Sequence, residues 1–91
     1  MSTTLRLPTV LARAAGGVTS HEVHGRTVGE AVADLALRYP ELGPRLRDAR
    51  GEPYPYVIFY LDDEDIRFQK GFATPLPEGA EILVVPAIAG G

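Results

Sequence analysis

Alternating and continuous apolar positions divide the chain into short extended segments. Residues 3–7 alternate polar and apolar side chains, which predicts a strand. Residues 18–24 are rich in β-branched and polar side chains and predict a second, more exposed strand. Residues 56–61 have high β propensity and predict a third. The nearly continuous apolar run at 80–86 predicts a last strand that is covered on both faces and central in its sheet.

A helical pattern stands between these strands. Thr27 and Glu30 form the T-x-x-E pattern of a capped helix N-terminus. Apolar side chains then recur every three and four residues over residues 28–39, which predicts an amphipathic helix. Pro40 ends it, because a residue before proline avoids the helical region.

Shorter elements connect the helix to the last strand. Residues 41–48 predict a short second helix, with Leu42 and Leu46 facing inward. The acidic run at residues 62–65 predicts a turn, and residues 66–68 predict a short return strand.

The order of these elements predicts an α+β domain. One main helix can cover one face of a mixed sheet of four to five strands, and a long crossover allows the first and last strands to pair in parallel. This is the β-grasp, or ubiquitin-like, architecture. We expect a domain over residues 1–86 and a flexible tail over residues 87–91. The shared periodicity predicts a core that contains Leu5, Leu7, Val28, Val32, Leu35, Val57, Phe59, Ile82 and Val84.

Composition narrows the classes of function. The 91 residues correspond to one small domain, and the absence of cysteine excludes disulfides, thiolate zinc sites and a catalytic thiol. A formal charge of −3 argues against nucleic-acid binding. We find neither a membrane-spanning run nor the apolar region of a signal peptide, and cysteine usage fits a reducing compartment, so we expect a cytoplasmic protein.

Two groups of potential metal ligands are interpreted as structural. The acidic run at residues 62–65 lacks the ligand spacing and central glycine of a calcium loop. We expect a solvated turn that binds no metal, with contact to a basic partner surface as the alternative. His21 and His24 are three residues apart, which places them on opposite faces of a strand and makes them a poor metal pair.

The end of the chain is its most distinctive feature: Ala87, Ile88, Ala89, Gly90 and Gly91 follow the last apolar run. Two glycines carry no side chain, so an enzyme can draw the terminal carboxylate into a narrow channel. Such a tail suits a protein whose own carboxyl group reacts. The dipeptide by itself is more typical of a frayed chain end, and the rest of the chain reverses that preference.

The chain as a whole resembles the ubiquitin-like sulfur carriers of the ThiS/MoaD family. The motifs that carry the resemblance are Leu7-Pro8-Thr9-Val10-Leu11, the capped helix from Thr27, residues 63–68, the turn Pro77-Glu78-Gly79 and the apolar last strand that leads to Gly90-Gly91. The first and third motifs look most like the CysO branch, which carries sulfur for cysteine synthesis. Ala80, where the family often has an acidic residue, and the bulky Ile88 depart from the pattern.

The resemblance implies a protein co-substrate rather than an enzyme. A ubiquitin-activating-like enzyme would use ATP to adenylate the Gly91 carboxylate, and sulfur transfer would then give a thiocarboxylate. Gly90, Ala89, Ile88 and Ala87 would be recognised as the tail. The implied partners are this adenylating enzyme, a sulfur-accepting synthase of the cysteine-synthase type, and a metalloprotease that trims the tail. No bound cofactor is expected, since ATP belongs to the activating partner.

Partner docking is expected on the sheet beside the tail. Leu61, Phe68 and Phe72 are the candidates, whereas Phe59, which shares strand parity with Leu61, is expected in the core. Two alternatives stay open at this stage. The first concerns the role: the chain is a binding subunit whose tail inserts non-covalently into a partner, or a modifier attached to lysines. The second concerns the pathway: the carrier gives its sulfur to molybdopterin, thiamine or a thio-containing secondary metabolite.

Overall fold

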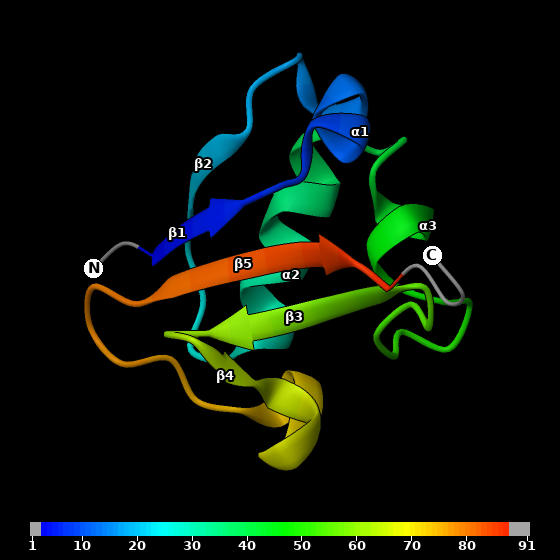
Figure 1. Cartoon of the computed structure of the whole chain (residues 1–91). Helices are drawn as coiled ribbons and strands as arrows, with labels where there is room; N and C mark the ends of the chain where they lie inside the picture. Colours follow the sequence, from blue (N-terminus) through cyan, green and yellow to red (C-terminus); the bar gives the residue numbers. More distant parts are fainter. Residues whose placement is uncertain (1–2, 88–91) are drawn as a thin grey trace.

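A computed structural model describes residues 3–87, which form a mixed five-stranded sheet with the longest helix on one face (Figure 1). The strand order is β2-β1-β5-β3-β4. The strands are β1 (Thr3–Arg6), β2 (Ser20–Val23), β3 (Val57–Leu61), β4 (Glu64–Asp65) and β5 (Glu81–Pro86). The helices are α1 (Thr9–Ala12), α2 (Val28–Arg38) and α3 (Gly43–Leu46), with 3-10 turns η1 (Arg13–Ala15), η2 (Ile66–Phe68) and η3 (Gly71–Ala73).

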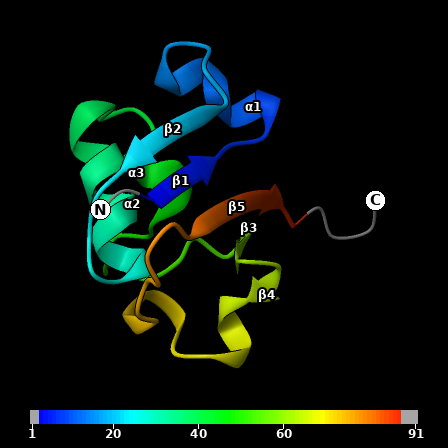
Figure 2. The ribbon, with the colours of Figure 1, turned by 90° about the vertical axis from the view of Figure 1, so that its left-hand side faces the viewer.

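The predicted α+β, β-grasp architecture is confirmed. β1 and β5 pair in parallel, with Leu5 opposite Ile82, as the long crossover allows. β5 also pairs with β3 in antiparallel fashion, with Val84 opposite Phe59, and is therefore the central strand. α2 lies behind these three strands in Figure 1 and to one side of them in Figure 2.

The predicted helix cap forms with one change of partner. The Thr27 side-chain oxygen accepts a hydrogen bond from the Glu30 backbone N–H at 3.1 Å. Glu30 accepts in return from the backbone N–H of Arg26 at 2.8 Å, one residue before the expected donor. These bonds fix the start of α2, which ends at Arg38 before Pro40.

The core lies between α2 and one face of the sheet. Eight of the nine predicted core residues are buried, and Leu42 and Leu46 face inward as expected. Val57 is the exception, because it lies at the start of β3 and is only half-buried against the core. The additional buried residues include Val23, Ala31, Ile66 and Ala80.

The prediction of a return strand over residues 66–68 is wrong. The return strand is β4 alone, and the chain turns at once into η2. The Asp65 side chain accepts a hydrogen bond from the Arg67 backbone N–H at 2.8 Å and so caps the start of η2. Asp62 and Asp63 make the hairpin turn, both with positive φ (48° and 74°), as a type I′ turn requires.

Candidate functional site

The two faces of the central strand β5 differ in their exposure. Ile82 and Val84 are buried, but Leu83 between them is 38% exposed and Val85 is half-buried. Successive strand residues point to opposite faces, and α2 covers only one of them. The expectation that β5 is covered on both faces is therefore wrong, and an apolar face of the sheet is open.

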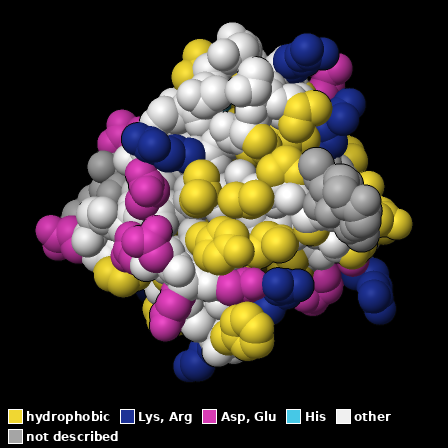
Figure 3. Space-filling view, in the orientation of Figure 1, with side chains coloured by type: hydrophobic (Ala, Val, Ile, Leu, Met, Phe, Trp, Pro, Cys, Tyr) yellow, Lys and Arg dark blue, Asp and Glu magenta, His cyan; other side chains and the backbone are white. Residues whose placement is uncertain are grey.

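The strand register brings further apolar side chains beside Leu83. Tyr60 of β3 lies opposite Leu83, and Ile58 lies opposite Val85. We call these four residues, Ile58, Tyr60, Leu83 and Val85, the open-face patch. Figure 3 shows apolar side chains gathered over the centre of this face. Such a patch on a small protein marks a surface suited to contact with another protein.

Charged residues flank the patch where β5 begins. Glu81 forms an ion pair with Arg6, with Nε and Oε2 3.1 Å apart. The Asp62 carboxylate accepts a hydrogen bond from the Glu81 backbone N–H at 2.9 Å, and the Asp62 N–H donates to the Glu81 carbonyl. Figure 3 shows acidic side chains along this flank, so the patch has an apolar centre and a charged border.

The other end of β5 fixes the root of the predicted tail. The backbone N–H of Ala87 donates a hydrogen bond to the Tyr56 carbonyl at 2.9 Å. Tyr56 is 65% exposed and packs edge-on against Tyr54, with ring centroids 5.4 Å apart. The chain therefore reaches Ala87 at the border of the open face. The predicted functional residues Ile88, Ala89, Gly90 and Gly91 lie outside the described residues.

The predicted docking residues need correction. Leu61 shares a face with Phe59, as its parity predicted, but that face is the core and Leu61 is only 5% exposed. Phe72 is half-buried and packs against Phe59, with ring centroids 5.2 Å apart. Phe68 alone is freely accessible, at 85% exposure. Leu61 is thus removed from the available surface because it belongs to the hydrophobic core together with Phe59.

The four residues of the open-face patch were not predicted from the sequence, although a signal for them was present. Ile82 and Val84 were predicted to be buried, and strand alternation then sends Leu83 and Val85 to the opposite face. A single main helix covers only one face of a sheet. Together these two rules predict that the residues between the core positions are exposed.

The two groups interpreted from the sequence as structural rather than metal-binding include residues with structural contacts. Asp65 pairs with Arg67 at 2.7 Å, and the hydrogen bonds from that guanidinium hold the pKa of Asp65 below its usual value. His21 is buried, hydrogen-bonds the Val18 carbonyl at 2.7 Å and packs against Tyr39, whereas His24 is exposed. Within residues 3–87 no three His, Asp or Glu side chains gather as a metal site would require.

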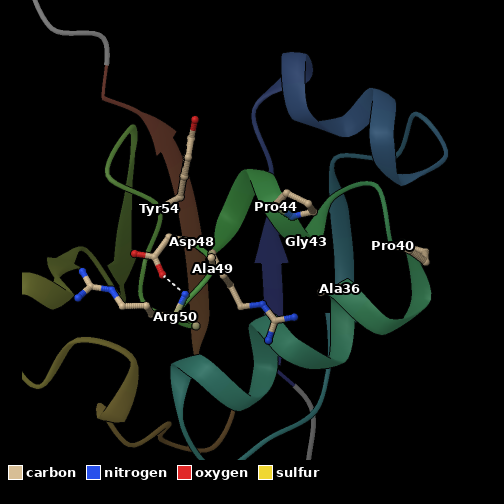
Figure 4. A pocket seen from close by; sticks show the side chains of 10 residues that line it. Ala36, Pro40, Gly43, Pro44, Asp48, Ala49, Arg50 and Tyr54 are labelled. Carbon is tan, nitrogen blue, oxygen red and sulfur yellow. Dashed lines mark hydrogen bonds between the residues drawn. The ribbon is translucent and has the colours of Figure 1, made fainter.

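A separate shallow groove of about 980 Å³ lies between the end of α2, α3 and the loop that follows. Its one acidic side chain, Asp48, is engaged within the lining loop. The Asp48 carboxylate accepts hydrogen bonds from the backbone N–H groups of Glu52 and Arg50, which lower its pKa. Figure 4 shows Arg50 extending away from Ala36 and Pro40. No convergent polar site forms among the lining residues.

The part of the chain that the structure describes contains no helix with the length and apolar character needed to cross a membrane.

The candidate site is the open-face patch together with the root of the tail at Ala87.

The chain is similar to known sulfur carrier proteins over almost its whole length. The model of the ThiS family matches residues 5–91. The sulfur carrier protein CysO of Mycobacterium tuberculosis is 37% identical over 93 aligned positions that span all of both chains.

Solved structures show the same relationship. A chain in the crystal structure of the Amycolatopsis orientalis BexX/CysO complex superposes with a TM-score of 0.89 and 32% identity, covering 98% of this chain and 99% of that one. SAMP1 from Haloferax volcanii superposes with a TM-score of 0.83 and 26% identity over all of both chains.

Proposed function

Because the chain belongs to the ThiS family, we propose that it is a sulfur carrier protein and that its sulfur serves cysteine biosynthesis. The observation that carries the proposal is the match to CysO, which spans the whole of that protein and includes the Gly90-Gly91 terminus. The chain acts in this scheme as a co-substrate, since the reacting group is its own carboxylate.

The chemistry begins at the Gly91 carboxylate, which is a poor acyl donor until its oxygen becomes part of a good leaving group. An activating enzyme transfers AMP from ATP to this oxygen and releases pyrophosphate. Hydrosulfide sulfur then attacks the carbonyl carbon, the bond to the AMP oxygen breaks, and AMP leaves with that oxygen. The product is a C-terminal thiocarboxylate, whose sulfur is the nucleophile of the next step.

The open-face patch would provide the binding energy that the tail lacks. Holding a chain segment in one conformation costs about 1–2 kcal/mol per residue, so fixing the four residues after Ala87 inside a partner would cost roughly 4–8 kcal/mol. Burial of the exposed apolar atoms of Tyr60 and Leu83 against a partner can offset part of this cost, at about 25 cal/mol per Å². The Tyr56–Ala87 hydrogen bond keeps the tail root beside that patch.

Three partners follow from this scheme. The first is a ubiquitin-activating-like enzyme that binds the ATP. The second is a synthase that presents an electrophilic carbon to the thiocarboxylate, and cysteine is the product we favour. The third is a metalloprotease that frees the product from the carrier tail and restores the carboxylate.

Pyrophosphate exchange with the purified activating enzyme tests the proposal. Removal of Gly90 and Gly91 should abolish exchange, because the carboxylate would then end too early to reach the nucleotide. Gly91→Val should also fail, because a β-branched side chain would crowd a channel shaped for glycine. Both variants should keep the parent melting temperature, since the substitutions lie beyond β5. Exchange at the parent rate by the truncated protein would show that carboxyl activation is not its function.

A protein modifier is the second candidate, favoured by the superposition on SAMP1, a small archaeal modifier protein. Mass spectrometry of the C-terminus separates the two. A sulfur-for-oxygen exchange supports the carrier, whereas an isopeptide link to lysine supports the modifier.

A further inference from the structure

The two edges of the sheet are protected in different ways. β4 contains two residues and leads straight into η2, so this edge offers little backbone for pairing. β2 is twice as long, and Figure 2 shows it at the other edge with α2 beside it. An unprotected edge strand can pair with a strand of another molecule.

The register identifies the backbone groups of β2 that face outward. His21 and Val23 lie opposite Leu5 and Thr3 of β1, and the Leu7 N–H donates to the Thr19 carbonyl. Residues of this parity hydrogen-bond with β1, and the alternate residues point their N–H and C=O groups away from the sheet. The groups of Ser20, Glu22 and His24 therefore form the free edge.

Two side chains of α2 reach across to this edge. Arg38 donates from a guanidinium nitrogen to the Glu22 carbonyl at 2.6 Å. The Asp34 carboxylate accepts from the His24 backbone N–H at 2.9 Å. Arg38 and Asp34 also pair with each other at 3.3 Å, one helical turn apart. They thus satisfy an adjacent acceptor and donor of the edge, as an added strand would.

We propose that Asp34 and Arg38 form a clasp that closes the β2 edge and prevents a second copy of this chain from adding there as an antiparallel strand. With the Glu22 carbonyl and the His24 N–H occupied, only the two groups of Ser20, the Glu22 N–H and the His24 carbonyl remain for an incoming strand, and the occupied groups interrupt them. That is too short a ladder to hold two molecules together.

A second copy is the relevant occupant because every molecule carries the same edge. Antiparallel pairing of one edge with itself obeys a two-fold axis, which is the commonest symmetry of soluble dimers. The charges of Asp34 and Arg38 would also have to lose their contacts with the backbone before such pairing. The clasp therefore opposes association in two ways. It occupies the edge groups of β2, and an incoming strand would have to displace the charged side chains of Asp34 and Arg38 from them.

Sedimentation and hydrogen exchange on the full chain test the clasp. In the Asp34→Ala/Arg38→Ala variant, the His24 amide should exchange about fivefold to tenfold faster, as expected for the loss of one hydrogen bond. The same variant should show dimers whose fraction rises with protein concentration. Arg38→Lys keeps a charged donor and should remain monomeric. Arg45→Ala, which removes an exposed arginine from α3, is the matched control and should behave like the parent.

Two results would overturn the proposal. One is a double variant that stays monomeric at every concentration while its His24 amide exchanges faster. The other is a parent protein that dimerises as readily as the variant. If the double variant unfolds, the single Asp34→Ala variant carries the exchange test, because it frees the His24 N–H and leaves Arg38 on the Glu22 carbonyl. A His24 amide that then exchanges as slowly as in the parent would also overturn the proposal.

Discussion

Asp65 sets the backbone course where the chain leaves β4. Its carboxylate accepts from the Arg67 backbone N–H and from the Arg67 guanidinium, at distances between 2.7 and 3.2 Å. The side chain of Asp65 is only 9% exposed, and that of Arg67 is 64% exposed. A carboxylate held in this way favours the 3-10 turn η2 over a longer strand, and it presents Phe68 at the surface.

The lowered pKa of Asp65 predicts a pH-dependent contribution to stability. A depressed pKa in the folded state adds stability above the unfolded value of about 3.9, and that stability is lost as the pH falls through the folded pKa. Asp65→Asn should therefore melt at a lower temperature than the parent near pH 7. The difference should shrink below about pH 4. Thermal melts of both proteins across this range make the measurement, and a difference that does not depend on pH would contradict the role of the charge.

At the scale of elements, Gly29 allows α2 to approach the segment that follows η2. A Cβ at this position would lie 2.9 Å from the Cβ of Phe72 and 3.0 Å from its carbonyl oxygen. Helix propensity alone argues for alanine there by about 1 kcal/mol. The glycine is kept because Phe72 must come close enough to α2 to pack on Phe59.

Gly29→Ala should therefore destabilise the protein by about 1–2 kcal/mol, against the propensity scale, because the added methyl displaces backbone at Phe72. Chemical denaturation measures the change. Leu37→Ala on the exposed side of the same helix is the control and should stay within about 0.5 kcal/mol of the parent. A more stable Gly29→Ala protein would mean that η3 moves aside without cost.

At the scale of the whole molecule, one helical layer on a five-stranded sheet leaves the other face open. The open-face patch and the root of the tail at Ala87 share that side of the molecule. Under the proposed function, we therefore expect a partner that receives the tail to contact this face. Its contact would position the reactive carboxylate without any catalytic group on the carrier itself.

Leu83→Asp should lower kcat/KM for adenylation by about tenfold or more, as expected when a central apolar contact is replaced by a charge. The melting temperature should change little, because Leu83 is already partly exposed. Leu37→Asp places the same charge on α2, where Leu37 is 82% exposed, and should keep the parent rate. Equal losses in both variants would show that net charge, rather than the open face, governs docking.

The sequence by itself determined the secondary-structure skeleton and most of the core. The Thr27 cap and the helical period of α2 act through neighbours along the chain, and strand alternation correctly paired Leu61 with Phe59 on one face. The terminal glycines are visible in the sequence itself. Their proposed role follows from the chemistry of the terminal carboxylate rather than from the packing of side chains.

Only the tertiary structure decided which face of each strand is covered. Leu61 and Leu83 are both apolar residues in strands, yet one is buried and the other is open. Alternation fixes which residues share a face, but the position of α2 decides which face becomes the core. The clasp of Asp34 and Arg38 on β2 depends on the same placement. Contacts between distant segments carry no local pattern, so they appear only when the helix and the sheet pack together.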